Sequence, residues 1–180
     1  MNLADVPAMA SDETFHVVIE SPRGSALKLK YEPKWRTMVV WRPLALGLVF
    51  PFDWGFVPST KMPDGDPLDA FLVWDASSIP GLVVECGPIG VLQVSQNRTN
   101  HDSSARVRND RILAVPIDSP RQKPLRSFAD LGDRVLKEYE QFAIAATTLQ
   151  GKDVEIVGWA TARMLWGLIR EPMQVERGRP

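Results

Sequence analysis

The chain has 180 residues, 44% of them hydrophobic, which is enough apolar material for one core in a single domain spanning residues 1–180. A formal charge of -1 and a pI of about 6.1 lack the basic excess that binding to a nucleic-acid backbone requires. The N-terminus has no signal-peptide pattern and no run approaches the roughly eighteen apolar residues of a membrane span, so we expect a soluble cytoplasmic protein.

The first half of the chain predicts a β-barrel. Short runs of β-branched and aromatic residues, broken by Pro and Gly, predict strands over 15–20, 27–31, 37–41, 69–74 and 82–94, the last interrupted at Gly87 and Pro88. This spacing is typical of a closed or nearly closed antiparallel sheet. Cys86 lies in the last of these strands, and because it is a lone cysteine it excludes an internal disulfide and is expected to be a buried thiol.

A polar segment and a strand follow. Residues 96–110 have no apolar period, which predicts an exposed loop leading into a strand over 111–117. The histidines, one in the first strand and one in this loop, are too far apart in sequence to indicate a zinc site.

Two helices are expected near the C-terminus, packed on the barrel. Ser127 and Asp130 have the spacing of a capping box, and apolar residues at helical spacing then predict one long helix that ends at Gly151. A strand over 154–159 and a helix over 161–171, closed by Pro172, complete the expected order. The last residues, 173–180, are expected to be disordered.

The strongest chemical signal is the acidic turn formed by residues 64–69, which places Asp64, Asp66 and Asp69 close together just before an apolar strand. Adjacent carboxylates repel one another unless a pKa rises or a cation intervenes. Oxygen ligands at this density suit Mg²⁺ with a substrate phosphate. A plain Asp-Gly turn is the simpler alternative, and an EF-hand calcium loop fits poorly because the ligand and glycine positions do not match.

Charged residues also interrupt strands that otherwise have a buried pattern: Glu20, Lys30, Glu32 and Arg42. Lys30 and Glu32 are two apart, so both project from one face of a strand. Surface ion pairs would explain them, and so would a barrel mouth where bases bind phosphate oxygens and acids hold metal.

The chain resembles the soluble inorganic pyrophosphatases of the OB-barrel type over about residues 13–168. The resemblance is carried, in family order, by Val17-Val18-Ile19-Glu20, Lys30-Tyr31-Glu32, Arg42, Pro51-Phe52-Asp53-Trp54-Gly55-Phe56, Asp64-Gly65-Asp66-Pro67-Leu68-Asp69, Pro88-Ile89-Gly90-Val91-Leu92, Leu113-Ala114-Val115-Pro116 and Gly158-Trp159. It implies an α+β fold that is mainly β, an OB-like five-stranded antiparallel barrel with two packed α-helices. It also implies a cytoplasmic homo-oligomer, with a hexamer usual among bacterial members, and Mg²⁺-dependent hydrolysis of inorganic pyrophosphate to two phosphates.

Residue roles follow from the same resemblance. Asp66 is expected to help deprotonate the attacking water. The expected metal ligands are Asp64, Asp69, Glu20, Glu32 and Asp110, and the expected substrate-binding residues are Lys30, Arg42, Arg111 and Trp54. Bound metal would lower the pKa of the water and offset charge on the leaving phosphate.

The chain also departs from the family pattern around this nucleus. Phe50 and Trp54 replace tyrosines, and neutral Gln96, Asn97 and Asn109 stand where metal-binding acids are expected, with Asp110 next to the last of them. The Tyr-Lys phosphate clamp of the long helix falls on Ala145 and Ala146. Each charge-assisted phosphate contact that is lost costs about 1.5 to 3 kcal/mol.

The departures leave three functions open. The first is hydrolysis of inorganic pyrophosphate, and the second is hydrolysis of another diphosphate whose organic group stacks on Trp54. The third is a weakened or non-catalytic barrel that binds a phosphorylated ligand. Charged residues of the 96–110 segment would replace missing groups in an active enzyme, or form an ordinary solvated loop.

Overall fold

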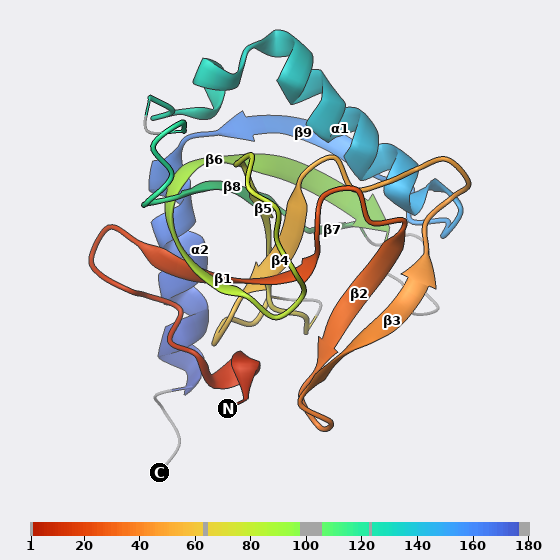
Figure 1. The fold of residues 1–180 in the computed structure, drawn as a ribbon. Coiled ribbons are helices and arrows are strands. Elements are labelled where there is room, and N and C mark those ends of the chain that lie inside the picture. Colours follow the sequence, from red (N-terminus) through yellow and green to blue (C-terminus); the bar gives the residue numbers. More distant parts are fainter. Residues whose placement is uncertain (1, 63–64, 98–105, 123, 177–180) are drawn as a thin grey trace.

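The computed structural model describes residues 2–62, 65–97, 106–122 and 124–176 (Figure 1). In chain order its elements are η1 (Leu3–Asp5), β1 (Phe15–Ser21), β2 (Leu27–Glu32), β3 (Thr37–Pro43), β4 (Asp53–Val57), β5 (Leu68–Leu72), β6 (Val83–Asn97), β7 (Arg106–Arg108), β8 (Arg111–Pro116), η2 (Phe128–Leu131), α1 (Asp133–Thr148), β9 (Glu155–Ala160) and α2 (Ala162–Glu176).

Five strands close into a barrel in the order β1-β4-β5-β8-β6, and β6 returns to pair with β1. Strands β7 and β9 extend this sheet from β6, whereas β2 and β3 form a separate hairpin that stands apart from the barrel (Figure 1). The pairings are antiparallel except for β5 with β8, which is parallel. The predicted five-stranded barrel with two helices is therefore confirmed, with one parallel pair in place of a wholly antiparallel sheet.

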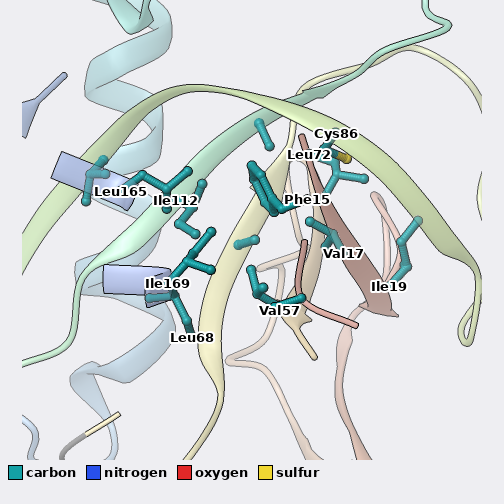
Figure 2. Close-up of a cluster of buried hydrophobic side chains, with 14 residues drawn as sticks. Phe15, Val17, Ile19, Val57, Leu68, Leu72, Cys86, Ile112, Leu165 and Ile169 are labelled. Carbon is teal, nitrogen blue, oxygen red and sulfur yellow. The ribbon is translucent and has the colours of Figure 1, made fainter. Parts of the chain in front are cut away.

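Two cores cover the two faces of the barrel sheet, as the alternation along β5 shows. Leu68, Ala70 and Leu72 belong to the core that includes α2, whereas Phe71 belongs to the core that includes α1. Figure 2 shows the first core, in which Leu165 and Ile169 of α2 lie among strand side chains. Cys86 is fully buried there, as expected.

Strand β4 is absent from the predicted elements because Asp53 and Gly55 have low strand propensity. The structure gives the reason for the glycine. A Cβ at Gly55 would lie 2.0 Å from the carbonyl oxygen of Val18, so β1 and β4 approach more closely than any other side chain allows.

Strand β6 also differs from its prediction, because it runs without a break through Gly87 and Pro88. The pairing with β8 shifts register between Pro88 and Gly90, so that a β-bulge absorbs the irregular residues. The strand also continues to Asn97 and pairs with β7, so both ends of the predicted 96–110 loop belong to a hairpin.

The helix boundaries differ from the prediction in two places. The capping box at Ser127 starts the short η2, and α1 begins only after Gly132, whose φ of 76° interrupts the helical conformation. Helix α2 continues through Pro172 to Glu176, so this proline does not close it, and the expected disorder of 177–180 lies outside the described residues.

Candidate active site

The site begins as two neighbouring rows of side chains on the barrel face that α1 partly covers. The first row is Phe56, Asp69 and Arg111, which are register partners across β4, β5 and β8. The next row is Trp54, Phe71 and Leu113, which pack into the core under α1. The parallel β5–β8 pair therefore places an acid beside a base at the point where the apolar core ends.

The β2–β3 hairpin brings further charged residues over this end of the face. Lys28, Lys30 and Glu32 alternate along β2, and all three side chains line one cavity. The hairpin is anchored where the backbone N–H of Tyr31 donates to Glu20 Oε1 at 2.7 Å. Glu20 lies in a β1 bulge, because the register with β4 shifts between its two neighbours.

The cavity between hairpin and barrel has a volume of about 410 Å³. Its charged lining among the described residues comprises the carboxylates Glu20, Glu32, Asp66 and Asp69 and the lysines Lys28, Lys30 and Lys152. Acids and bases from β1, from the hairpin and from the acidic turn thus meet around one space.

Two acids in this cavity hold protons more tightly than usual. Burial raises the pKa of Glu20 from 4.5 to about 7, against the Tyr31 hydrogen bond, which lowers it, and with a further increase from the charge of Asp69. Burial also raises the pKa of Asp69, although Lys28 and Arg111 oppose the shift. Both carboxyl groups are thus short of positive charge in the metal-free protein.

Asp66, from the acidic turn, forms an ion pair with Lys30 across the cavity. Lys30 Nζ lies 2.8 Å from Asp66 Oδ2, and this contact raises the pKa of Lys30 against the effect of burial. The ammonium also lies 5.0 Å from the ring centre of Trp41 on β3. The position of Lys30 is therefore fixed by an acid on one side and an aromatic ring on the other.

A second, smaller cavity of about 30 Å³, room for about two water molecules, lies between the hairpin and α1. Arg42 crosses this space, because its Nη2 donates to the carbonyl oxygen of Ala146 at 2.6 Å. Trp54, 4% exposed, forms part of the wall. Lys28 Nζ lies 5.0 Å and Arg111 Cζ 5.8 Å from the ring centre of Trp54, so both cations contact one indole.

The comparisons identify the family. Residues 17–176 match the family model described as inorganic pyrophosphatase. The chain belongs to the inorganic pyrophosphatase family. It is 32% identical over 171 residues to the inorganic pyrophosphatase of Synechocystis sp., covering 95% of this chain and 96% of that one. It is 29% identical over 174 residues to that of Nostoc sp., covering 97% and 98%.

The fold agrees with solved structures of the same family. The inorganic pyrophosphatase of Thermus thermophilus superposes with a TM-score of 0.88 at 28% identity, covering 99% of this chain and all of that one. The resemblance seen in the sequence is thereby confirmed. Neither helix, within the described residues, has the length and apolar run needed to cross a membrane.

Most of the residues expected from the family lie together. Glu20, Lys30, Glu32, Asp66 and Asp69 line the larger cavity. Arg42, Arg111 and Trp54 line the smaller one. Asp64, an expected metal ligand, lies outside the described residues.

Asp110 is the expected metal ligand that the structure places elsewhere. Its carboxylate accepts from the guanidinium of Arg108 at 2.8 and 2.9 Å and from the backbone N–H of Val94 at 3.0 Å. It lines neither cavity, whereas the neighbouring Asn109 lines the larger one. The buried acid next to the neutral Asn109 is thus paired with the exposed Arg108, and it does not supply a ligand in place of Asn109.

The other departures from the family pattern leave neutral walls. Ala146 lines the smaller cavity without a charged group, and Ala145 is exposed. Phe50 lies in the wall of the same cavity, stacked at a tilt on Trp54 with ring centres 6.1 Å apart. Gln96 is buried, and no described residue bonds its Oε1.

Two lysines of the site were missed by the sequence reasoning. Lys28 lines both cavities, and Lys152, which precedes β9, lines the larger one. The alternation Lys28, Lys30, Glu32 in the printed sequence is a signal that could have found the first. Lys152 has no such signal, because only the packing of the turn after α1 brings it there.

The donor chemistry of the larger cavity fits a hard divalent cation. Its acids offer only carboxylate oxygens, and the raised pKa values of Glu20 and Asp69 show a local shortage of positive charge that a cation would relieve. No three acidic, histidine or cysteine groups among the described residues are close enough to form a complete metal cluster. The part of the acidic turn that holds Asp64 is not among those residues.

Proposed function

We propose that this chain hydrolyses inorganic pyrophosphate to two phosphates and requires Mg²⁺. The observation that carries the proposal is the meeting of Asp66, Asp69 and Glu20 with lysines in one cavity of an inorganic pyrophosphatase family member. Phosphoryl transfer depends mainly on positioning and on neutralising charge, and this cavity offers groups for both.

Each of these residues has a role in the proposed reaction. Asp69 and Glu20, together with Glu32 and Asp64, would hold the metal through carboxylate oxygens. Bound divalent metal supplies a lower pKa for the attacking water and charge compensation on the phosphates.

The remaining polar groups bind substrate and accept a proton. Asp66 takes the proton of the attacking water, and Lys30 holds this carboxylate in place through their 2.8 Å contact. Lys30 and Arg111 donate to phosphate oxygens, and Arg42 is bound to the helix carbonyl of Ala146 while its buried Nε has no described partner.

A phosphate-release assay tests the proposal. Purified protein with pyrophosphate and Mg²⁺ is expected to release phosphate, and Asp66→Asn is expected to lower kcat by about a hundredfold or more, because a general base contributes about that much. Asp118→Asn, in the exposed turn after β8, is the matched control and should leave the rate unchanged. No release above the blank, or an Asp66→Asn rate equal to wild type, would contradict the proposal.

A second candidate is a barrel that binds a phosphorylated ligand without turnover. It is favoured by neutral Asn109 and Ala146 in the cavity walls. Calorimetry with a non-hydrolysable pyrophosphate analogue and Mg²⁺ separates the two, because binding without phosphate release supports only the second candidate.

Hydrolysis of an organic diphosphate held by stacking on Trp54 has less support. The ring is 4% exposed, and Lys28 and Arg111 contact it. A stacked organic group would have to displace these cations.

A cytoplasmic location and a homo-oligomeric state, such as a hexamer, are part of the same proposal. Family membership supports both, and the exposed apolar residues on the hairpin and after it, such as Trp35 and Leu46, further support the oligomer. Cell fractionation and sedimentation of the purified chain would test them.

A further inference from the structure

We infer that Lys28 is a further phosphate-binding residue of this site, where it holds the substrate phosphoryl group at the junction of the two cavities. This inference rests on the proposed function. It assigns a binding role to a residue outside the motifs that relate the chain to its family.

The position of Lys28 is the first observation. It is the one described residue that lines both the 410 Å³ and the 30 Å³ cavity. Its register partner on β3 is Arg42, which lines the smaller cavity. A group bound at the junction would therefore meet two cations from the same hairpin.

The second observation is that the side chain of Lys28 forms no hydrogen bond or ion pair with a described residue. No described residue accepts a hydrogen bond from its ammonium, which lies 5.0 Å from the ring centre of Trp54. Arg111, also buried, contacts the same ring, and its Nη1 donates a long hydrogen bond of 3.3 Å to the carbonyl oxygen of Asn109. Two cations thus share one indole and have few acceptors.

The third observation is a surplus of donors at this corner. Arg42 Nε and Trp54 Nε1 are both buried without a described acceptor. The α1 residues that line the smaller cavity bear no charge, and the Thr147 hydroxyl donates to helix carbonyls. Buried donors without acceptors beside a small cavity call for an anion that has several oxygens, which a phosphoryl group provides.

The acids of the larger cavity determine how a phosphoryl group bound beside Lys28 would be oriented. Asp69 and Glu20 act on Lys28 from the larger cavity, where the proposed metal ligands lie. A phosphoryl group at the junction would have its oxygens toward Lys28 and Arg111 and the scissile bond toward Asp66. Lys28 would then touch substrate directly, as a binding residue and not as a proton carrier.

The test replaces Lys28 with Met, which keeps the apolar stem against Trp54 and removes the charge. With Mg²⁺, calorimetry is expected to show inorganic phosphate binding weakened about tenfold or more, and the KM for pyrophosphate raised to a similar degree, with a smaller change in kcat. Lys28→Arg is expected to retain most of the affinity. Lys34→Met, on the exposed turn of the same hairpin, is the control and should match wild type.

The alternative is that Lys28 only supports the fold through its contact with Trp54. In that case the urea midpoint would fall, while phosphate affinity of the folded protein would stay within twofold of wild type, and that result overturns the inference. Lys28→Gln gives the same comparison if the Met variant does not fold. A wild type that binds phosphate but releases none from pyrophosphate contradicts the proposed activity alone, because the phosphate titration still decides on Lys28.

Discussion

Glu20 provides a direct test of the electrostatics of the site. Its side chain is 7% exposed, and its pKa is raised from 4.5 to about 7 chiefly by burial. Between pH 4.5 and about 7, Glu20 keeps its proton in the folded protein and loses it in the unfolded chain. The free energy of unfolding therefore falls as pH rises. At about 1.4 kcal/mol per pKa unit, the full decrease is about 3 kcal/mol.

Glu20→Gln should remove this dependence. Glutamine resembles the protonated acid, and its amide oxygen can still accept from the Tyr31 N–H that now lies 2.7 Å from Glu20. In metal-free buffer we expect the variant to equal wild type near pH 4.5 and to exceed it by about 3 kcal/mol above pH 7. Urea unfolding followed by fluorescence at several pH values measures the difference.

Magnesium should narrow this stability difference between wild type and Glu20→Gln. A cation held by Glu20 favours the ionised carboxylate, so Mg²⁺ is expected to stabilise wild type at pH 8 and to have less effect on Glu20→Gln. Glu13→Gln, on the exposed segment before β1, is the control and should follow wild type throughout. Parallel pH curves for wild type and Glu20→Gln in metal-free buffer would refute the reasoning.

Two further predictions concern the scaffold. Gly55→Ala should lower the free energy of unfolding by about 3 kcal/mol or more, because its Cβ would meet the Val18 carbonyl oxygen at 2.0 Å. Gly87→Ala, with nothing within 4 Å of the added Cβ, should change it by less than about 0.5 kcal/mol in denaturant titrations, and equal losses would refute the close approach of β1 and β4. Tyr139→Phe should raise stability by about 1 kcal/mol, since no described residue bonds its buried hydroxyl. Tyr31→Phe should lower stability by a similar amount, because the Tyr31 hydroxyl accepts from the Leu3 N–H and donates to Asn2 Oδ1. Thermal melts in which both Tyr→Phe variants shift the melting temperature in the same direction would contradict this prediction.

The sequence predicted those barrel strands in which the local β-propensity of the residues matches the structure that they adopt. The strands with β-branched and aromatic runs were found, whereas β4 was missed because Gly55 is selected by a close backbone approach and not by propensity. The parallel pairing of β5 with β8 could not be read locally, since it joins segments that are distant in the chain. The capping box at Ser127 was real, but it starts η2, because Gly132 interrupts the helix after it.

The candidate site was predictable to the extent that its residues follow short-range rules. The alternation of Lys30 and Glu32 and the acidic turn account for four of the five expected residues in the larger cavity, and Glu20 on β1 is the fifth. Asp110 could not be judged from sequence, because the Val94 N–H that its carboxylate accepts from lies on β6, sixteen residues away in the chain. Lys28 was missed because its importance depends on the hairpin packing against Trp54.

The parallel β5–β8 pair has a consequence for how the protein matures. No tight turn can join such a pair, so the intervening chain, including all of β6 and β7, must be made and arranged before Asp69 and Arg111 become neighbours. During synthesis and refolding, the segment between β5 and β8 must therefore close into a loop before the site is complete. A nascent chain that stops short of β8 would display the acidic turn and the charged hairpin yet remain without the cation that faces them.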